Sequence, residues 1–125
     1  MAVVSLRARF EGTNRQNLID ELKRQEFVNG CDDLAHAFAK MGKLVEFCHG
    51  DKIIEEGARD NDLYLLIVGS VSVIIKRNDY RLRTAGSHVG EMAAIEPSQP
   101  RSATVIAINS VLAADSPRSR SPILF

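Results

Sequence analysis

The chain has 125 residues, the size of one ordinary domain, and folding at this length buries roughly two-thirds of the surface of the unfolded chain. Its 16 basic and 16 acidic side chains give a formal net charge of zero, which argues against binding nucleic acid by bulk electrostatics. A hydrophobic content of 45% excludes a wholly disordered chain. The longest apolar run, Leu63–Val68, is far shorter than the roughly twenty residues that span a bilayer. We therefore expect a folded domain with neither nucleic acid nor membrane as a partner.

The N-terminus and the cysteines indicate the compartment. Residues 1–7 lack the charged stretch and apolar core of a secretory signal, which predicts a cytoplasmic protein. Cys31 and Cys48 could form one disulfide, but free buried thiols in a reducing compartment are the favoured interpretation.

Residues 1–41 are predicted to be a helical lead-in, loose up to Thr13. Capping residues such as Asn14, an apolar face and Gly42 as a stop predict two short amphipathic helices, over about 15–25 and 32–40. The apolar positions are Leu18, Ile19 and Leu22 in the first helix and Leu34, Ala35, Phe38 and Ala39 in the second.

After Gly42 the spacing of apolar residues changes to that of strands separated by turn residues. The predicted strands are 44–47, 53–54, 63–68, 71–75, 81–84, 102–108 and 111–114. Asn78-Asp79 marks a turn, and Arg81 and Arg83 alternate with Leu82 as they do on a solvated sheet face. Short strands about ten residues apart predict a mainly β fold, a sandwich or barrel over 42–114.

The last segment, 115–125, is predicted to be a mobile tail. Ser116-Pro117 has the form of a helix start, but Pro122 interrupts any helix within about a turn and a half. The composition of this segment is of low complexity.

The segment from His88 to Val105 carries the strongest chemical signal. Gly90 allows close backbone approach, and a single helical turn over 91–95 offers free N–H groups to an anion. Arg101, Ser102 and the N–H of Ala103 follow at the head of a strand, and a guanidinium, a hydroxyl and an amide together suit a phosphate. Glu91 accepts hydrogen bonds only, so it suits ribose hydroxyls instead. The two groups match the two ends of a sugar phosphate.

This pattern resembles the phosphate-binding cassette of cyclic nucleotide-binding domains, the family of the catabolite activator protein and the regulatory subunit of protein kinase A. The residues that carry the resemblance are Gly90-Glu91-Met92-Ala93, Arg101-Ser102-Ala103-Thr104-Val105, and upstream Gly50–Gly57 and Leu63–Gly69. The resemblance implies a double-stranded β-helix (jelly roll) preceded by N-terminal helices. It covers about 34–114.

The resemblance also implies roles for single residues. Glu91, beside the backbone of Gly90, would hold the ribose 2′-hydroxyl, and Arg101 would pair with the cyclic phosphate. Ser102, Ala103 and the amide of Ala93 would complete the phosphate cradle. Met92 and Thr104 belong to the same cassette. A cyclic mononucleotide is thus the implied ligand, a homodimer the implied assembly, and no cofactor is implied.

A narrower resemblance concerns the lead-in. Arg9–Gly12, the helix 17–25 and His88–Ala93 are together similar to the sensor half of bacterial proteins that fuse this domain to a TIR domain, as in the TIR effectors of Pycsar anti-phage defence. This implies cyclic UMP or cyclic CMP as the ligand, which there activates cleavage of NAD⁺ by the TIR half. The present sequence contains no TIR segment, so we expect no enzymatic activity from this chain.

Three alternatives stay open. A metal-dependent cupin would need clustered ligands, but His36, His49 and His88 are scattered and form no metal-ligand motif. An activator-type transcription regulator responding to cyclic AMP or GMP would need a helix-turn-helix supplied by a longer chain. A roll that has lost its ligand and serves as an interaction surface is the last alternative.

Overall fold

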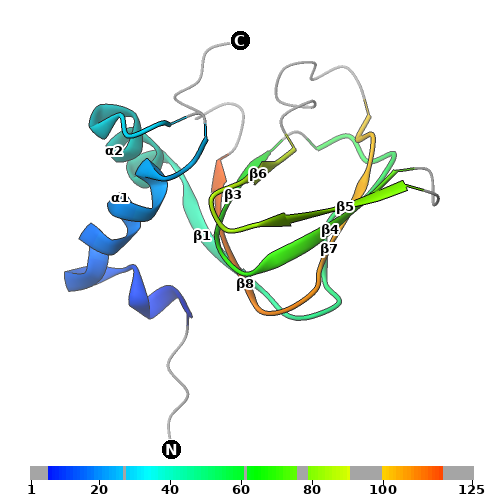
Figure 1. The fold of residues 1–125 in the computed structure, drawn as a ribbon, viewed down its shortest axis with the longest axis horizontal. Helices are drawn as coiled ribbons and strands as arrows, with labels where there is room; N and C mark the ends of the chain where they lie inside the picture. The colour runs from blue at the N-terminus through cyan, green and yellow to red at the C-terminus, as the bar shows by residue number, and fades with distance from the viewer. Residues whose placement is uncertain (1–5, 27, 61, 76–78, 91–99, 117–125) are drawn as a thin grey trace, which may run out of the picture.

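The computed structural model describes residues 6–26, 28–60, 62–75, 79–90 and 100–116, and it arranges them as a helical layer beside a β-roll (Figure 1). The helical segments are η1 (Leu6–Arg9), η2 (Gly12–Asn14), α1 (Arg15–Lys23) and α2 (Asp32–Met41). Both predicted helices are confirmed, although α1 ends at Lys23 rather than near residue 25. The lead-in is less loose than predicted, because Phe10 is buried between the 3₁₀ turns and the helices.

The described residues form eight strands after the helices. They are β1 (Lys43–Phe47), β2 (Lys52–Ile54), β3 (Leu63–Val68), β4 (Ser70–Ile75), β5 (Asp79–Thr84), β6 (His88–Val89), β7 (Thr104–Ala107) and β8 (Val111–Ser116). They pair into two four-stranded sheets, β1-β8-β3-β6 and β2-β7-β4-β5, and every pairing is antiparallel. The predicted mainly β roll with helices at its N-terminal side is confirmed.

The central strands β3 and β8 of the sheet β1-β8-β3-β6 are buried on both faces, which explains the unbroken apolar run of β3. Successive side chains of a strand point to opposite faces, so β3 and β8 each contribute to two cores. The helix-facing core includes Leu18, Leu22, Phe38, Leu63, Leu65, Ile67 and Leu112. The core inside the roll includes Ile54, Tyr64, Leu66, Val71, Val89, Val105 and Ala113.

Several predicted boundaries differ from the structure. β6 was not predicted at all, and β7 is shorter than the predicted strand 102–108. Ser116 is buried and is the last residue of β8, so the strand continues two residues beyond 114. The remaining part of the predicted tail, 117–125, lies outside the described residues.

The structure corrects one expectation about the cysteines. Cys31 and Cys48 are free, but both are exposed, so the prediction of buried thiols was wrong. Within the described ranges, no helix has the length and apolar character needed to cross a membrane. The domain boundaries at 41 and 114 stay predictions. Residues of α1 and α2 share a core with residues of β3 and β8.

Candidate functional site

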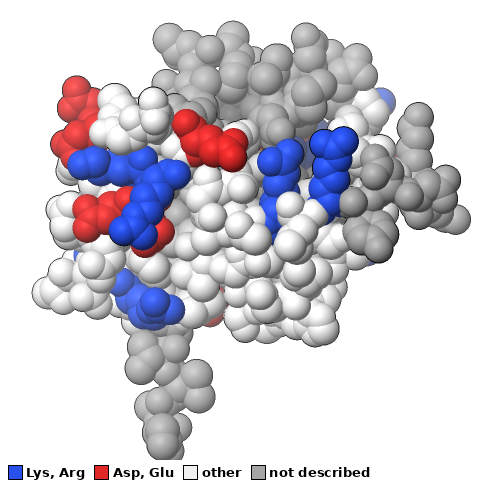
Figure 2. Space-filling model, in the orientation of Figure 1, with Lys and Arg blue, Asp and Glu red and all other residues white. Residues whose placement is uncertain are grey.

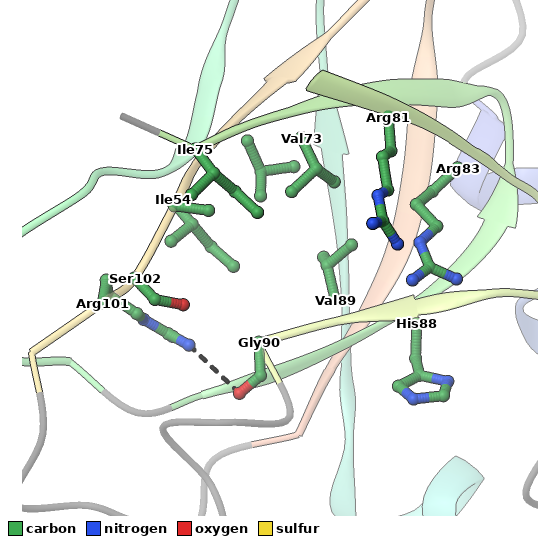
Figure 3. A pocket seen from close by; sticks show the side chains of 12 residues that line it. Ile54, Val73, Ile75, Arg81, Arg83, His88, Val89, Gly90, Arg101 and Ser102 are labelled. Carbon is green, nitrogen blue, oxygen red and sulfur yellow. Dashed lines mark hydrogen bonds between the residues drawn. The ribbon is translucent and has the colours of Figure 1, made fainter. Parts of the chain in front are cut away.

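A pocket of about 260 Å³ opens on the inner face of the sheet β2-β7-β4-β5 (Figure 3). Its described lining has three parts. An apolar floor comprises Ile54, Val73, Ile75, Val89 and Val105. The Arg101 end comprises Gly90, Arg101, Ser102 and Ala103, and the β5 end comprises Arg81, Arg83 and His88. Figure 3 shows these two polar ends on opposite sides of the apolar side chains.

Arg101 is held in a fixed position at its end of the pocket. Only 2% of its side chain is exposed, and Nη2 lies 2.7 Å from Oδ2 of Asp60. Nη2 also donates to the carbonyl oxygen of Asp62 at 2.8 Å, and Nη1 donates to that of Gly90 at 3.2 Å. The third donor, Nε, is buried and has no hydrogen-bond partner among the described residues. The guanidinium is therefore positioned by three acceptors, while its buried Nε–H has no acceptor among the described residues.

The backbone around Arg101 is pinned as firmly as its side chain. Its N–H donates to the carbonyl of Ala58 at 2.7 Å, and its own carbonyl accepts from Gly57 at 2.8 Å. Thr104 takes part in the same attachment, because its Oγ1 accepts from the N–H of Glu56 at 3.1 Å. The loop after β2 thus positions the residues that lead into β7.

Gly90 is required by the geometry of this end. Its φ is +93°, which L side chains rarely adopt. A Cβ at this position would lie 2.6 Å from the carbonyl oxygen of Asp62 and 2.8 Å from Nη1 of Arg101. The absence of a side chain at Gly90 thus lets the backbone approach both the Asp62 carbonyl and the Arg101 guanidinium closely.

Arg81 is exposed to solvent, as its alternation with Leu82 predicted, but the β5 end places both arginines on the inner face of the sheet. In the β4–β5 ladder Arg83 lies opposite Val71, and Arg81 lies opposite Val73. Directly paired residues of antiparallel strands share a face, and Val71 is fully buried inside the roll. The two arginines therefore occupy the inner face and line the pocket, whereas Leu82, on the outer face, is 63% exposed.

The structure brings together part of the predicted cassette. Gly90, Arg101, Ser102 and Ala103 line one pocket, and Figure 3 shows the Ser102 hydroxyl beside Arg101. Thr104 is half-buried and is not among the lining residues. The remaining members, Glu91, Met92 and Ala93, lie outside the described residues, so their roles stay predictions. His88, the first residue of β6, is half-buried in the lining.

An acidic group lies behind the Arg101 end. Burial raises the pKa of Asp115 to about 7, and the hydrogen bond and negative charge of Asp62 add to the rise. Asp115 lies opposite Tyr64 in the β3–β8 ladder. Burial raises the pKa of the Tyr64 phenol to about 12, so this group stays neutral at physiological pH.

The fold and the pocket together define a ligand-binding β-roll, and comparison with known proteins identifies its family. The sequence profile of the cyclic nucleotide-binding domain matches residues 44–120. The chain belongs to the cyclic nucleotide-binding domain family.

Similar proteins support this assignment. The chain is 42% identical over 100 residues to the Pycsar effector protein BcPycTIR of Burkholderia cepacia, a match covering 79% of this chain and 33% of that protein. It is 40% identical over 100 residues to PaPycTIR of Pseudomonas aeruginosa, covering 79% of this chain and 32% of that protein. The chain thus spans about a third of the length of these relatives.

The fold has a close counterpart among solved structures. The regulatory domain of Toxoplasma gondii PKA, solved with cAMP, superimposes with a TM-score of 0.76. The match has 23% sequence identity and covers 86% of this chain and 43% of that one, so it shows the shared fold.

Proposed function

We propose that this chain is a sensor module that binds the ribose and cyclic phosphate of a cyclic mononucleotide and signals to an effector domain. Arg101, Ser102 and Ala103 receive the phosphate. Gly90 and Glu91 hold the ribose, and Met92, Ala93 and Thr104 complete the cassette. The ligand is cyclic UMP or cyclic CMP.

The observation that carries this proposal is the unused donor of Arg101. A buried N–H without an acceptor costs about 1–3 kcal/mol, and a charged group costs more. Nε is such a donor among the described residues, and it belongs to a side chain that lines the pocket. An anionic ligand oxygen would satisfy it with a charge-assisted hydrogen bond. A roll retained only as an interaction surface has no comparable need for a buried guanidinium beside a pocket.

The fixed position of Arg101 supports binding of a rigid anion. Asp60 and two carbonyls already hold two of its nitrogens, so little side-chain entropy is lost when a ligand binds. The described lining contains no carboxylate that would repel a phosphate. Both features favour an anion small enough for a pocket of about 260 Å³.

The effector is proposed from the relatives. Two Pycsar effector proteins match this chain over about a third of their length, which leaves room in them for a further domain. We take that domain to be a TIR NAD⁺ hydrolase that ligand binding activates in anti-phage defence. Binding would act by population shift, stabilising the form of the roll that the effector recognises.

Calorimetry with cyclic UMP, CMP, AMP and GMP tests the ligand class. At least one is expected to bind the wild-type chain, and Arg101→Ala should weaken that binding at least about tenfold through loss of charge-assisted hydrogen bonds. Unchanged affinity in a folded Arg101→Ala variant would remove Arg101 from the site.

Because Arg101 is buried, replacing it can unfold the chain and so abolish binding indirectly. A second variant at an exposed position separates loss of binding from loss of folding. Ser102 is exposed, so Ser102→Ala should fold normally and weaken binding by about three- to tenfold, the value of one hydrogen bond. Ser110→Ala is the matched control, since Ser110 is equally exposed and lies outside the pocket lining. Equal affinities of both serine variants would contradict the assignment of Ser102.

A further inference from the structure

The β5 end of the pocket has basic side chains on the inner face of its sheet, where apolar side chains are usual. A row of directly paired residues, Arg81, Val73, Val105 and Ile54, crosses β5, β4, β7 and β2 on the inner face. Three of its members are apolar and line the pocket floor, and the fourth is a guanidinium. Arg83 stands two residues further along β5, on the same face. The chain therefore places two arginines where a roll interior would normally continue with apolar side chains.

Neither arginine is used to hold the fold together. Within the described part of the chain, neither Arg81 nor Arg83 makes a hydrogen bond or an ion pair, in contrast to Arg101. Figure 2 shows basic side chains over β4 and β5, whereas the helical layer carries basic and acidic side chains side by side. Figure 3 shows both arginines extending from β5 toward the pocket. Their donors are thus available to a ligand.

We infer that Arg81 and Arg83 read the base of the bound cyclic nucleotide and favour a base that presents carbonyl oxygens. This rests on the proposed function. With the phosphate at the Arg101 end, the base must extend over the apolar floor toward the opposite end of the pocket. Its far edge then meets the guanidinium groups of β5.

The chemistry of a guanidinium sets the direction of this preference. Arginine donates hydrogen bonds and accepts none, and its planar fork suits adjacent acceptors. Uracil presents the O4 carbonyl at its edge, and guanine presents O6 and N7, whereas cytosine and adenine present amino groups at the corresponding positions. An amino group facing a guanidinium sets donor against donor. A carbonyl-bearing base is therefore favoured over its amino counterpart in both the pyrimidine and the purine series.

Matched ligand pairs test this by calorimetry on the intact chain. Cyclic UMP and cyclic CMP differ by carbonyl against amino at one ring position, as do cyclic IMP and cyclic AMP. The wild type is expected to bind the carbonyl member about tenfold more tightly in whichever series fits, the discrimination of one good arginine contact. In Arg81→Gln/Arg83→Gln that ratio should fall to about threefold or less.

Two control variants separate base reading from simple charge attraction. Arg81→Lys/Arg83→Lys keeps both charges but lacks the fork, so it should retain overall affinity while losing much of the carbonyl preference. Lys40→Gln removes one positive charge from the exposed end of α2, outside the pocket lining, and should leave the ratio unchanged.

The outcomes are distinguishable from failure of the proposed function. If no cyclic nucleotide binds the wild type, the proposed function falls, and this inference falls with it. If nucleotides bind with equal affinity for carbonyl and amino members, the inference alone is wrong. A uniform loss for all four ligands in the glutamine variant would likewise overturn it, since that result shows that the arginines only attract the anion.

Discussion

At one end of the pocket Arg101 is almost wholly buried and donates to Asp60, Asp62 and Gly90, while at the other end Arg81 is exposed and Arg83 half-exposed. Neither of the latter two makes a hydrogen bond or an ion pair with the described residues. The same side chain thus serves as part of the scaffold at one end and as a free set of donors at the other. We expect changes at the Arg101 end to affect stability and binding together, and changes at the β5 end to affect ligand choice alone.

Gly90→Ala should produce the largest effect. The added Cβ meets the Asp62 carbonyl and the Arg101 guanidinium, and φ is unfavourable, so we expect a loss of about 2–4 kcal/mol in the free energy of unfolding. Urea titration measures it. Gly50→Ala is the control, because Gly50 has a φ of +92° but nothing within 4 Å of a Cβ, and it should cost only about 1–2 kcal/mol. Equal losses in the two variants would show that the close approach at Gly90 does not affect the free energy of unfolding.

Asp60→Ala should have the next largest effect. It removes the counter-charge from a guanidinium that is 2% exposed, but two carbonyls remain and Asp60 itself is 49% exposed. We therefore expect a loss of about 1–2 kcal/mol, below that of a fully buried pair. The control is Glu26→Ala, which removes an exposed carboxylate outside the pocket lining. A loss no larger than that of the control would mean that the ion pair is not needed to hold Arg101.

Asp115 predicts a pH dependence of stability at the Arg101 end. Its folded-state pKa is raised from 3.8 to about 7, so the folded chain binds more protons than the unfolded chain between these values. Stability should therefore fall as the pH rises from about 4 to 7 and level off above that range.

Asp115→Asn should flatten this pH dependence and stabilise the chain at pH 8 relative to the wild type, because it removes a partly buried charge beside Asp62. Thermal unfolding at pH 5 and pH 8 provides the measurement. Asp33→Asn, at an exposed position of α2, should leave the wild-type dependence in place. A wild-type stability that rises over this interval would contradict the assignment.

Replacement of Arg81 and Arg83 by Gln should have the smallest effect on stability, under about 0.5 kcal/mol, since neither side chain makes a hydrogen bond or an ion pair within the described fold. The same urea titration applies. A loss above about 1 kcal/mol would show that the β5 end is also part of the scaffold.

The sequence allowed the strands to be found but not the register of one hairpin. Apolar runs bounded by turn residues located β3, β4 and β8, and the spacing of Gly90 and Arg101 located one end of the pocket. A two-residue turn at Asn78-Asp79 would have paired Ile75 with Leu82. The structure instead pairs Ile75 with Asp79, a shift of three residues. An odd shift turns every side chain of a strand to the other face, so the observed register places Arg81 and Arg83 on the inner face, which their alternation with Leu82 alone did not indicate.

Other differences have equally local causes. β6 has only His88 and Val89 and pairs with the edge of β3, too short a segment for any periodicity to indicate. Ser116 was assigned to the tail beyond residue 114, but its pairing with Leu63 makes it the last residue of β8. In both cases contacts distant in sequence decided the structure, and local preference did not.

The two-sided burial of β3 has a mechanical consequence. Leu63, Leu65 and Ile67 touch the helices, while Tyr64 and Leu66 belong to the interior that also holds the pocket floor. β3 thus contributes to both the helix-facing core and the core inside the roll, and it lies between the interior of the roll and the helices. Close-packed interiors have low compressibility and transmit strain, so we expect a displacement of Tyr64 or Leu66 inside the roll to be passed through β3 to the helix-facing core.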